Sequence, residues 1–225
     1  MSAALDYLSA DYQRCALVVI DFQNDCILPD APFAVKGSME VLPALSALCQ
    51  GIRAAARPII HIVRGYLADG SNADLCRRDA IEKGLVLFRP KTEGADFPST
   101  LKPQNAPPLD WQVLLNGDIQ SLGRYDHVIY KPRWGAFFKT PLEEFLHAQR
   151  IHTLIVAGCN YPNCPRTTIY EASERDFRLV LARDAMSRLD ARGCEEMAGI
   201  GVHLATVEEI LNALSRTPSN HHNKK

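Results

Sequence analysis

The chain has 225 residues, 47% of them hydrophobic and 23% charged, with a formal net charge of −1. These values are typical of one globular domain with a single core, which we place at residues 1–215, followed by a disordered tail at 216–225. The balanced charge favours neither nucleic acid nor an anionic membrane surface as a partner. The N-terminal residues include acids and no apolar signal segment, and no window approaches ~18 consecutive apolar residues, so we expect a cytoplasmic protein.

Apolar strand-like runs alternate with amphipathic helical segments along the chain. The run CALVVIDF, residues 15–22, is continuous and β-branched, which is typical of a strand buried on both faces. Further strands are predicted over 57–65, 127–132, 152–158, 178–184 and 202–206, and helices over 39–56, 72–84, 141–150, 165–176 and 207–214. The proline-rich residues 88–110 predict an irregular excursion. This order predicts a doubly wound, three-layer α/β sandwich around a mostly parallel six-stranded sheet, a Rossmann-like arrangement.

Seven cysteines are spread through the chain, an odd number in a sequence without a secretion signal. This distribution argues against a disulfide framework. A structural zinc site needs two pairs of Cys or His ligands, each pair at short spacing. Only Cys159 and Cys164 come near that spacing, and the sequence has no second pair. We therefore expect no metal ion and no other cofactor.

Polar residues follow three of the predicted strands. Asp21 ends ALVVID, Lys131 ends HVIYK, and Cys164 follows LIVAG after a short loop. In open α/β sheets, ligands bind beyond the carboxyl ends of the strands. We therefore expect Asp21, Lys131 and Cys164 to lie along one edge of the sheet, in a functional site.

Cys164 precedes a proline and a helical segment. Pro165 suits the first helical position, which puts Cys164 at the N-cap, where the helix dipole and a nearby lysine would favour a thiolate. Asp21, a carboxylate at a strand end, would accept the thiol proton. The structural alternative stays open at this point, because a buried cysteine, a capping aspartate and a lysine at a strand end are each common on their own.

Three motifs resemble the isochorismatase-like cysteine hydrolases, a family that includes N-carbamoylsarcosine and ureidoacrylate amidases. ALVVIDFQND is similar to the family's first-strand motif, YKPRWGAFFKTPLEEFL to its lysine segment, and LIVAGCNYPNCPRTTIYEA to its nucleophile loop. The resemblance implies Asp21 as general base, Lys131 as electrostatic partner and Cys164 as nucleophile. It further implies a cis peptide between Cys159 and Asn160, an oxyanion hole formed by the N–H groups of Asn160 and Cys164, and a homodimer or homotetramer.

Departures from the family narrow the expected chemistry. Isochorismatase itself hydrolyses a vinyl ether without a nucleophilic cysteine, so Cys164 argues against that reaction. The chain reads HIVRGYLADGSN where nicotinamidases carry an Asp-x-His metal set, and we interpret His61 as a core histidine. The resemblance thus implies hydrolysis of a C–N bond in a small amide, ureide or lactam through a thioester on Cys164.

Several residues are candidates for the substrate pocket. Arg133 is a candidate to bind a carboxylate or ureide oxygen, and Trp134 is a candidate to cover a planar or cationic substrate. Phe137 is a candidate to line the pocket. The alternative for this segment is packing at a subunit interface. Gln23 and Arg64, which follow the first two strands, are further candidate substrate contacts. Gln23 has a structural alternative, in which its amide serves the loop backbone.

A different class of protein also stays open. A redox or structural α/β protein would use Cys159 and Cys164 as a pair, although their spacing and the following proline differ from the usual C-x-x-C arrangement. A nucleotide-binding module is disfavoured, because VIDFQND has no glycine where a phosphate-binding turn would follow the first strand.

Overall fold

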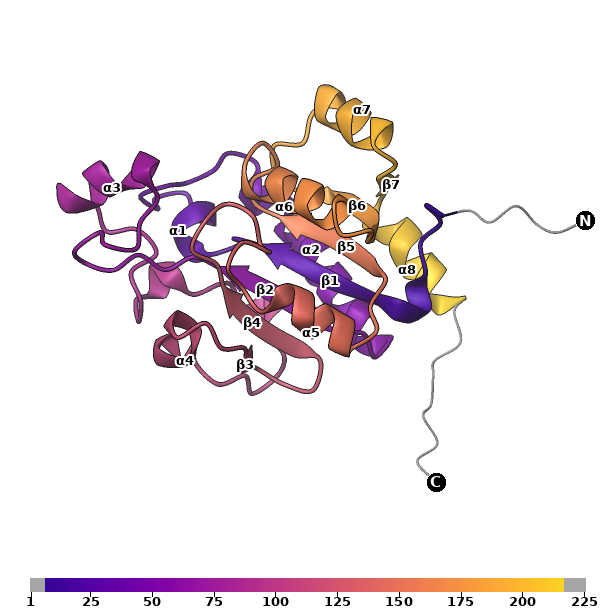
Figure 1. The fold of residues 1–225 in the computed structure, drawn as a ribbon, viewed down its shortest axis with the longest axis horizontal. Helices are drawn as coiled ribbons and strands as arrows, with labels where there is room; N and C mark the ends of the chain where they lie inside the picture. Colours follow the sequence, from indigo (N-terminus) through magenta and orange to yellow (C-terminus); the bar gives the residue numbers. More distant parts are fainter. Residues whose placement is uncertain (1–6, 217–225) are drawn as a thin grey trace, which may run out of the picture.

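The computed structural model describes residues 7–216, which form a mostly parallel sheet covered by helices on both faces (Figure 1). The strands are β1 (Cys15–Ile20), β2 (Ile59–Val63), β3 (Gln120–Ser121), β4 (Asp126–Tyr130), β5 (Thr153–Gly158), β6 (Arg178–Met186) and β7 (His203–Ala205). The α-helices are α1 (Asn24–Ile27), α2 (Ser38–Ala54), α3 (Leu75–Glu82), α4 (Trp111–Leu115), α5 (Leu142–Ala148), α6 (Cys164–Ser173), α7 (Ala191–Gly199) and α8 (Val207–Ser215). Within the described part of the chain, every helix is too short or too polar to cross a membrane.

The strand order is β3-β4-β2-β1-β5-β6-β7, and all pairs are parallel except β3 with β4. The chain moves outward from β1 through β2 to β4, and then returns to the other side of β1 with β5. The order therefore reverses between β1 and β5, and the carboxyl ends of these two strands flank the crevice where doubly wound folds bind ligands.

The two faces of the sheet bury separate apolar clusters. Leu17 and Val19 of β1 pack with residues of α2 and α8, whereas Val18 and Ile20 pack with residues of α5, α6 and α7. Since successive side chains of a strand point to opposite faces, a continuous apolar run supplies both clusters. This is the doubly wound α/β fold that the sequence predicts.

The structure differs from the prediction at the edges of the sheet. A seventh strand, the short β3, pairs antiparallel with β4, and it was missed because two residues carry no readable periodicity. Residues 88–110 are irregular, as predicted, apart from two short 3₁₀ helices, Glu93–Ala95 and Ser99–Leu101. Except for Arg216, the predicted tail at 216–225 lies outside the described residues.

Candidate active site

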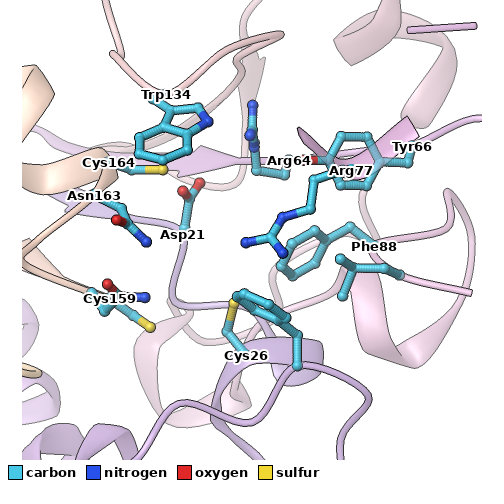
Figure 2. Close-up of a pocket in the computed structure, with 13 residues that line it drawn as sticks. Asp21, Cys26, Arg64, Tyr66, Arg77, Phe88, Trp134, Cys159, Asn163 and Cys164 are labelled. Carbon is cyan, nitrogen blue, oxygen red and sulfur yellow. The ribbon is translucent and has the colours of Figure 1, made fainter. Parts of the chain in front are cut away.

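A cavity opens at the carboxyl ends of β1 and β5, where the strand order reverses. The segments that follow β1, β2, β4 and β5 line it, including residues of α1, α3 and α6, and most of the lining residues are labelled in Figure 2. The lining residues are Asp21, Cys26, Phe33, Arg64, Tyr66, Arg77, Leu87, Phe88, Trp134, Cys159, Asn160, Asn163 and Cys164. The cavity volume is about 40 Å³, so it admits a small molecule or a few waters.

The sheet itself fixes the first wall of the cavity. The N–H groups of Asp21 and Lys131 continue the ladder beyond the strands, donating to the carbonyls of Ile62 and Val63 at 3.0 Å each. Gly158 ends β5 so close to β1 that a Cβ there would meet the carbonyl oxygen of Ile20 at 2.3 Å, and its φ of +124° is one that side chains rarely adopt. The loop that leads from β5 to α6 therefore starts beside Asp21.

Asp21 and Lys131 form a buried ion pair. Nζ of Lys131 lies 2.8 Å from Oδ2 of Asp21, and the lysine side chain is fully buried. Nζ also donates to the carbonyl of Arg133 at 3.1 Å. Among the described residues, Oδ1 of Asp21 has no hydrogen-bond partner. One carboxylate oxygen is therefore held by the lysine, while the other is left for a proton or a ligand.

Cys164 lies across from this carboxylate, with its sulfur near Asp21 in Figure 2. It is the first residue of α6 and Pro165 the second, while Asn163 is the N-cap, so the helix begins one residue earlier than predicted. At this position the backbone N–H has no intrahelical acceptor.

The thiol of Cys164 is not the thiolate that the sequence predicted. Burial, together with the negative charge of Asp21, raises the pKa of Cys164 to about 12, against the opposing effects of Lys131 and Arg64. The expectation was wrong because it considered the helix dipole and the lysine without the desolvation of the sulfur and the adjacent carboxylate. A protonated thiol needs a base before it can attack a carbonyl, and Asp21 is the adjacent carboxylate.

Two residues that line the cavity have backbone N–H groups without an acceptor among the described residues. The peptide between Cys159 and Asn160 is cis, and Asn160 and Cys164 both line the cavity. In the described part of the chain, neither the N–H of Asn160 nor that of Cys164 donates to an acceptor. Unpaired N–H groups beside a nucleophile are the donors that an oxyanion hole requires.

Cys159 is engaged away from Cys164. Its sulfur accepts a hydrogen bond from the hydroxyl of Ser38 at 3.4 Å, and a hydrogen bond with Cys26 lowers the pKa of the Cys159 thiol despite its burial. Every cysteine in the described residues is a free thiol. The redox alternative, in which Cys159 pairs with Cys164, gains no support from these contacts.

The second wall of the cavity comes from the loops after β2 and β4 and from α3. Arg64 pairs with the carboxylate of Asp74 at 2.5 and 3.3 Å, and the hydroxyl of Tyr66 donates to the same carboxylate at 2.7 Å. Trp134 covers the cavity on the side of Cys164 in Figure 2. The sequence indicated Arg64 and Trp134 as pocket residues, and the structure places both in the lining.

Other lining residues were not anticipated from the sequence. Tyr66, Arg77, Phe88 and Cys26 all line the cavity, and none of them was assigned to the site from the sequence. No periodicity distinguishes a helix residue that faces a cavity from one that faces solvent. Arg77 reaches the cavity because α3 lies beyond the carboxyl ends of the strands, which the sequence alone does not show.

Gln23 is not available to a substrate, which corrects the prediction. Its side chain is fully buried. The amide donates to the carbonyls of Arg64 and Ala95 at 2.9 and 2.7 Å, and its oxygen accepts the N–H of Arg64 at 2.7 Å. Because its hydrogen-bonding groups are used by backbone, Gln23 ties the β1 end to the loop after β2.

Arg133 and Phe137 also lie outside the cavity lining, contrary to prediction. The guanidinium of Arg133 donates to the carbonyls of Asn72 and Pro132, at 3.2 and 2.6 Å. Phe137 is buried in the cluster beneath α5 and α6, with its ring 5.9 Å from that of Phe177. Of the three candidates in this segment, only Trp134 lines the cavity.

His61 lies in the core, as the sequence indicated. Its Nε2 lies 3.1 Å from Oδ1 of Asp126, and its ring stacks on Phe97 at 4.6 Å. Burial lowers the pKa of His61. Residues 7–216 contain no cluster of three or more His, Cys, Asp or Glu side chains arranged to hold a metal ion.

Comparison with known proteins agrees with this architecture. The chain is 27% identical over 213 residues to a probable inactive nicotinamidase of Arabidopsis thaliana, covering 93% of this chain and 94% of the relative. It is 26% identical over 178 residues to a maleamate amidohydrolase of Pseudomonas putida, covering 77% and 72%. It is 28% identical over 179 residues to an N-carbamoylsarcosine amidase of Arthrobacter, covering 77% of this chain and 59% of the relative.

Solved structures give the same result. An isochorismatase family protein from Desulfovibrio vulgaris superposes with a TM-score of 0.76 at 29% identity, covering 91% of this chain and 100% of that one. A family model described as the isochorismatase domain matches residues 15–209. The sheet order, the strand-end motifs and these matches lead to one conclusion: the chain belongs to the isochorismatase family.

Proposed function

We propose that this protein is a cysteine amidohydrolase that cleaves the C–N bond of a small amide, ureide or lactam. One observation carries the proposal: the thiol of Cys164 and the carboxylate of Asp21 line the same small cavity at the strand-order reversal, and Lys131 pairs with that carboxylate from behind the lining. The names of two relatives, maleamate amidohydrolase and N-carbamoylsarcosine amidase, describe hydrolysis of such bonds in those proteins.

The first half-reaction is acylation of the cysteine. Asp21 accepts the thiol proton as the sulfur of Cys164 attacks the carbonyl carbon of the substrate. The carbonyl oxygen becomes an oxyanion, which the N–H groups of Asn160 and Cys164 stabilise. Asp21 then returns the proton to the leaving nitrogen, the C–N bond breaks, and ammonia or an amine departs from a thioester.

The second half-reaction releases the acid. Asp21 takes a proton from a water molecule, which attacks the thioester carbonyl in the same oxyanion hole. The C–S bond breaks, and the proton returns to the sulfur of Cys164. Lys131 stays on Oδ2 of Asp21 throughout, so that Oδ1 is the oxygen that carries the proton.

The test is release of ammonia or amine from a panel of small amides, ureides and lactams. We expect turnover of at least one compound by the wild-type protein, and a loss of about 10³-fold or more in kcat for both Cys164→Ala and Asp21→Asn. Cys194→Ala is the matched control, because Cys194 is a partly exposed free thiol that does not line the cavity.

Two results would contradict the proposal. One is an absence of turnover across the panel by correctly folded wild-type protein. The other is turnover that survives in Cys164→Ala at a rate similar to that of Cys194→Ala. In either case, the cavity thiol is not the nucleophile of an amidase.

A further inference from the structure

Arg77 of α3 points its guanidinium into the cavity, toward the wall that holds Asp21 and Cys164 (Figure 2). The guanidinium lies over the ring of Phe33, 4.1 Å from its centroid. A cation stacked on an aromatic face is held in place without using its N–H groups. Stacking therefore positions Arg77 and leaves its planar fork of donors open.

Three other arginines near the cavity, Arg64, Arg78 and Arg133, each donate hydrogen bonds within the protein, and only Arg64 among them lines the cavity; Nε of Arg78 has no partner among the described residues. Arg64 is bound to Asp74, the neighbouring Arg78 donates to the carbonyl of Ala73 at 3.1 Å, and Arg133 donates to two backbone carbonyls. Arg77 has neither an ion pair nor a side-chain hydrogen bond with any residue in the range 7–216. Its donors are the ones that a ligand can use.

The charges around the cavity are not balanced. The carboxylates of Asp21 and Asp74 are paired with Lys131 and Arg64, respectively. Asp25, near the cavity floor, turns its carboxylate to the N–H of Phe88 at 2.5 Å and does not line the cavity. The positive charge of Arg77 is thus left without a paired carboxylate in the described part of the chain, and such a charge at the wall of a cavity attracts an anion.

The size of the cavity and the residues that line it limit which molecules can carry that anionic group into the site. The volume of about 40 Å³ admits only a small molecule, and aromatic rings of Phe33, Tyr66, Phe88 and Trp134 border it. A guanidinium fork recognises a carboxylate through two parallel hydrogen bonds. A ligand that spans the cavity would present a carbonyl to Cys164 and a carboxylate to Arg77.

We propose that Arg77 is the residue that selects the substrate, by binding a carboxylate that lies a short distance from the scissile amide. The substrate class is a small acid with a terminal carboxamide, either the monoamide of a short dicarboxylic acid or an N-carbamoyl amino acid. This inference rests on the proposed amidohydrolase function for the identity of the second group, but the anion site itself can be measured without turnover.

The test uses two anionic probes, each with a neutral isostere. Succinamate is compared with isocaproamide, and N-carbamoylglycine with isobutylurea, in which an isopropyl group replaces the carboxylate. Binding to the full-length Cys164→Ala protein is measured by titration calorimetry, and ammonia release is measured with the wild-type enzyme. The pair with the larger preference for the anion identifies which of the two acids the cavity accommodates.

Three further variants are made in the same backgrounds. Arg77→Met removes the guanidinium and keeps much of the volume, and Arg77→Lys keeps the charge without the fork. Arg192→Met is the matched control, since Arg192 is an arginine of α7 with 86% of its side chain exposed, away from the cavity.

We expect at least one anion to bind ~10-fold or more tightly than its isostere, because hydrogen bonds to charged groups are the strong ones. Arg77→Met should remove the preference for the anion and leave the affinity for the neutral isostere within about twofold of the wild-type value. Arg77→Lys should retain part of the preference for the anion, and Arg192→Met should retain all of it. No preference for an anion, a preference that survives Arg77→Met, or an equal loss for both members of a pair would overturn the inference.

The outcomes separate the two proposals. If the wild-type enzyme hydrolyses amides but prefers the neutral members, the amidohydrolase proposal stands and the role of Arg77 fails. If the anions bind through Arg77 and no compound in either pair or in the wider panel releases ammonia or amine, the anion site stands and the amidohydrolase proposal fails.

Discussion

The two walls of the cavity are built in different ways. Asp21, Lys131 and Cys164 come from the ends of β1 and β4 and from the helix after β5, where parallel pairing fixes the backbone. Tyr66 and Arg77, in contrast, come from α3 and the loop before it, which lie beyond the carboxyl ends of the strands (Figure 1). The comparison indicates that the sheet positions the groups that we propose react, whereas α3 and the loop before it position the groups that we propose select a substrate.

The largest expected effect comes from breaking the ion pair on the sheet wall. Lys131→Met leaves the Asp21 carboxylate buried without its cation, and we expect a loss of about 3–5 kcal/mol in the free energy of unfolding. Urea denaturation measures this loss. The double variant Lys131→Met with Asp21→Asn should recover part of the stability and none of the activity, because the buried charge is gone but the base is not restored. A cost below about 1 kcal/mol for Lys131→Met, as for a surface pair, would contradict the account.

The second prediction concerns the thiol. Asp21 raises the pKa of Cys164, so Asp21→Asn should lower that pKa and increase the thiolate fraction at pH 7–9 by about tenfold for each unit. The rate of alkylation of Cys164 by iodoacetamide, followed by peptide mass spectrometry, should therefore rise while amidase activity disappears. A variant that loses activity and also alkylates no faster than the wild type would show that the carboxylate does not act on the sulfur.

The third prediction tests the link between the walls. Gln23→Ala removes a buried amide that binds the backbone of Arg64 and Ala95, and we expect a loss of about 1–3 kcal/mol in stability. Its matched control is Gln149→Ala, since Gln149 is exposed at the end of α5. If both variants unfold at the same urea concentration, the amide of Gln23 is not holding the two walls together.

The smallest expected effect belongs to the loop wall. Trp134→Ala should raise KM by about 2- to 10-fold and leave kcat within about threefold, because an aromatic contact contributes about 0.5–1.5 kcal/mol and the ion pair is made by Lys131 and Asp21 without Trp134. Phe138→Ala, which removes an exposed ring next to the same loop, should change neither parameter. A fall in kcat for Trp134→Ala comparable to that for Asp21→Asn would mean that the loop wall also takes part in the chemical step, contrary to this proposal.

The same division sets how much the sequence could predict. Strand ends are readable from continuous apolar runs, and parallel pairing then brings Asp21, Lys131 and Cys164 to one edge. The pKa of the Cys164 thiol could not be predicted from the sequence, because it depends on the burial of the sulfur, which only the packed structure defines.

The loop wall was harder to predict because the type of a residue does not determine whether its side chain faces the cavity. Arg133 and Arg77 are both arginines on segments near the strand ends, yet Arg133 binds the backbone behind the cavity and Arg77 faces into it. Gln23 was a candidate contact by its position after Asp21, and its amide is instead used by two loops. In each case, long-range packing of the loop after β2 decides the outcome.

The account depends most directly on a covalent bond at Cys164. The decisive measurement is the intact mass of the wild-type protein, quenched in acid during turnover of the best substrate from the panel, followed by peptide mapping. We expect an added mass equal to the acyl group, located on Cys164 and absent in Cys164→Ala. Steady turnover with unmodified Cys164, together with undiminished turnover by Cys164→Ala, would contradict the account.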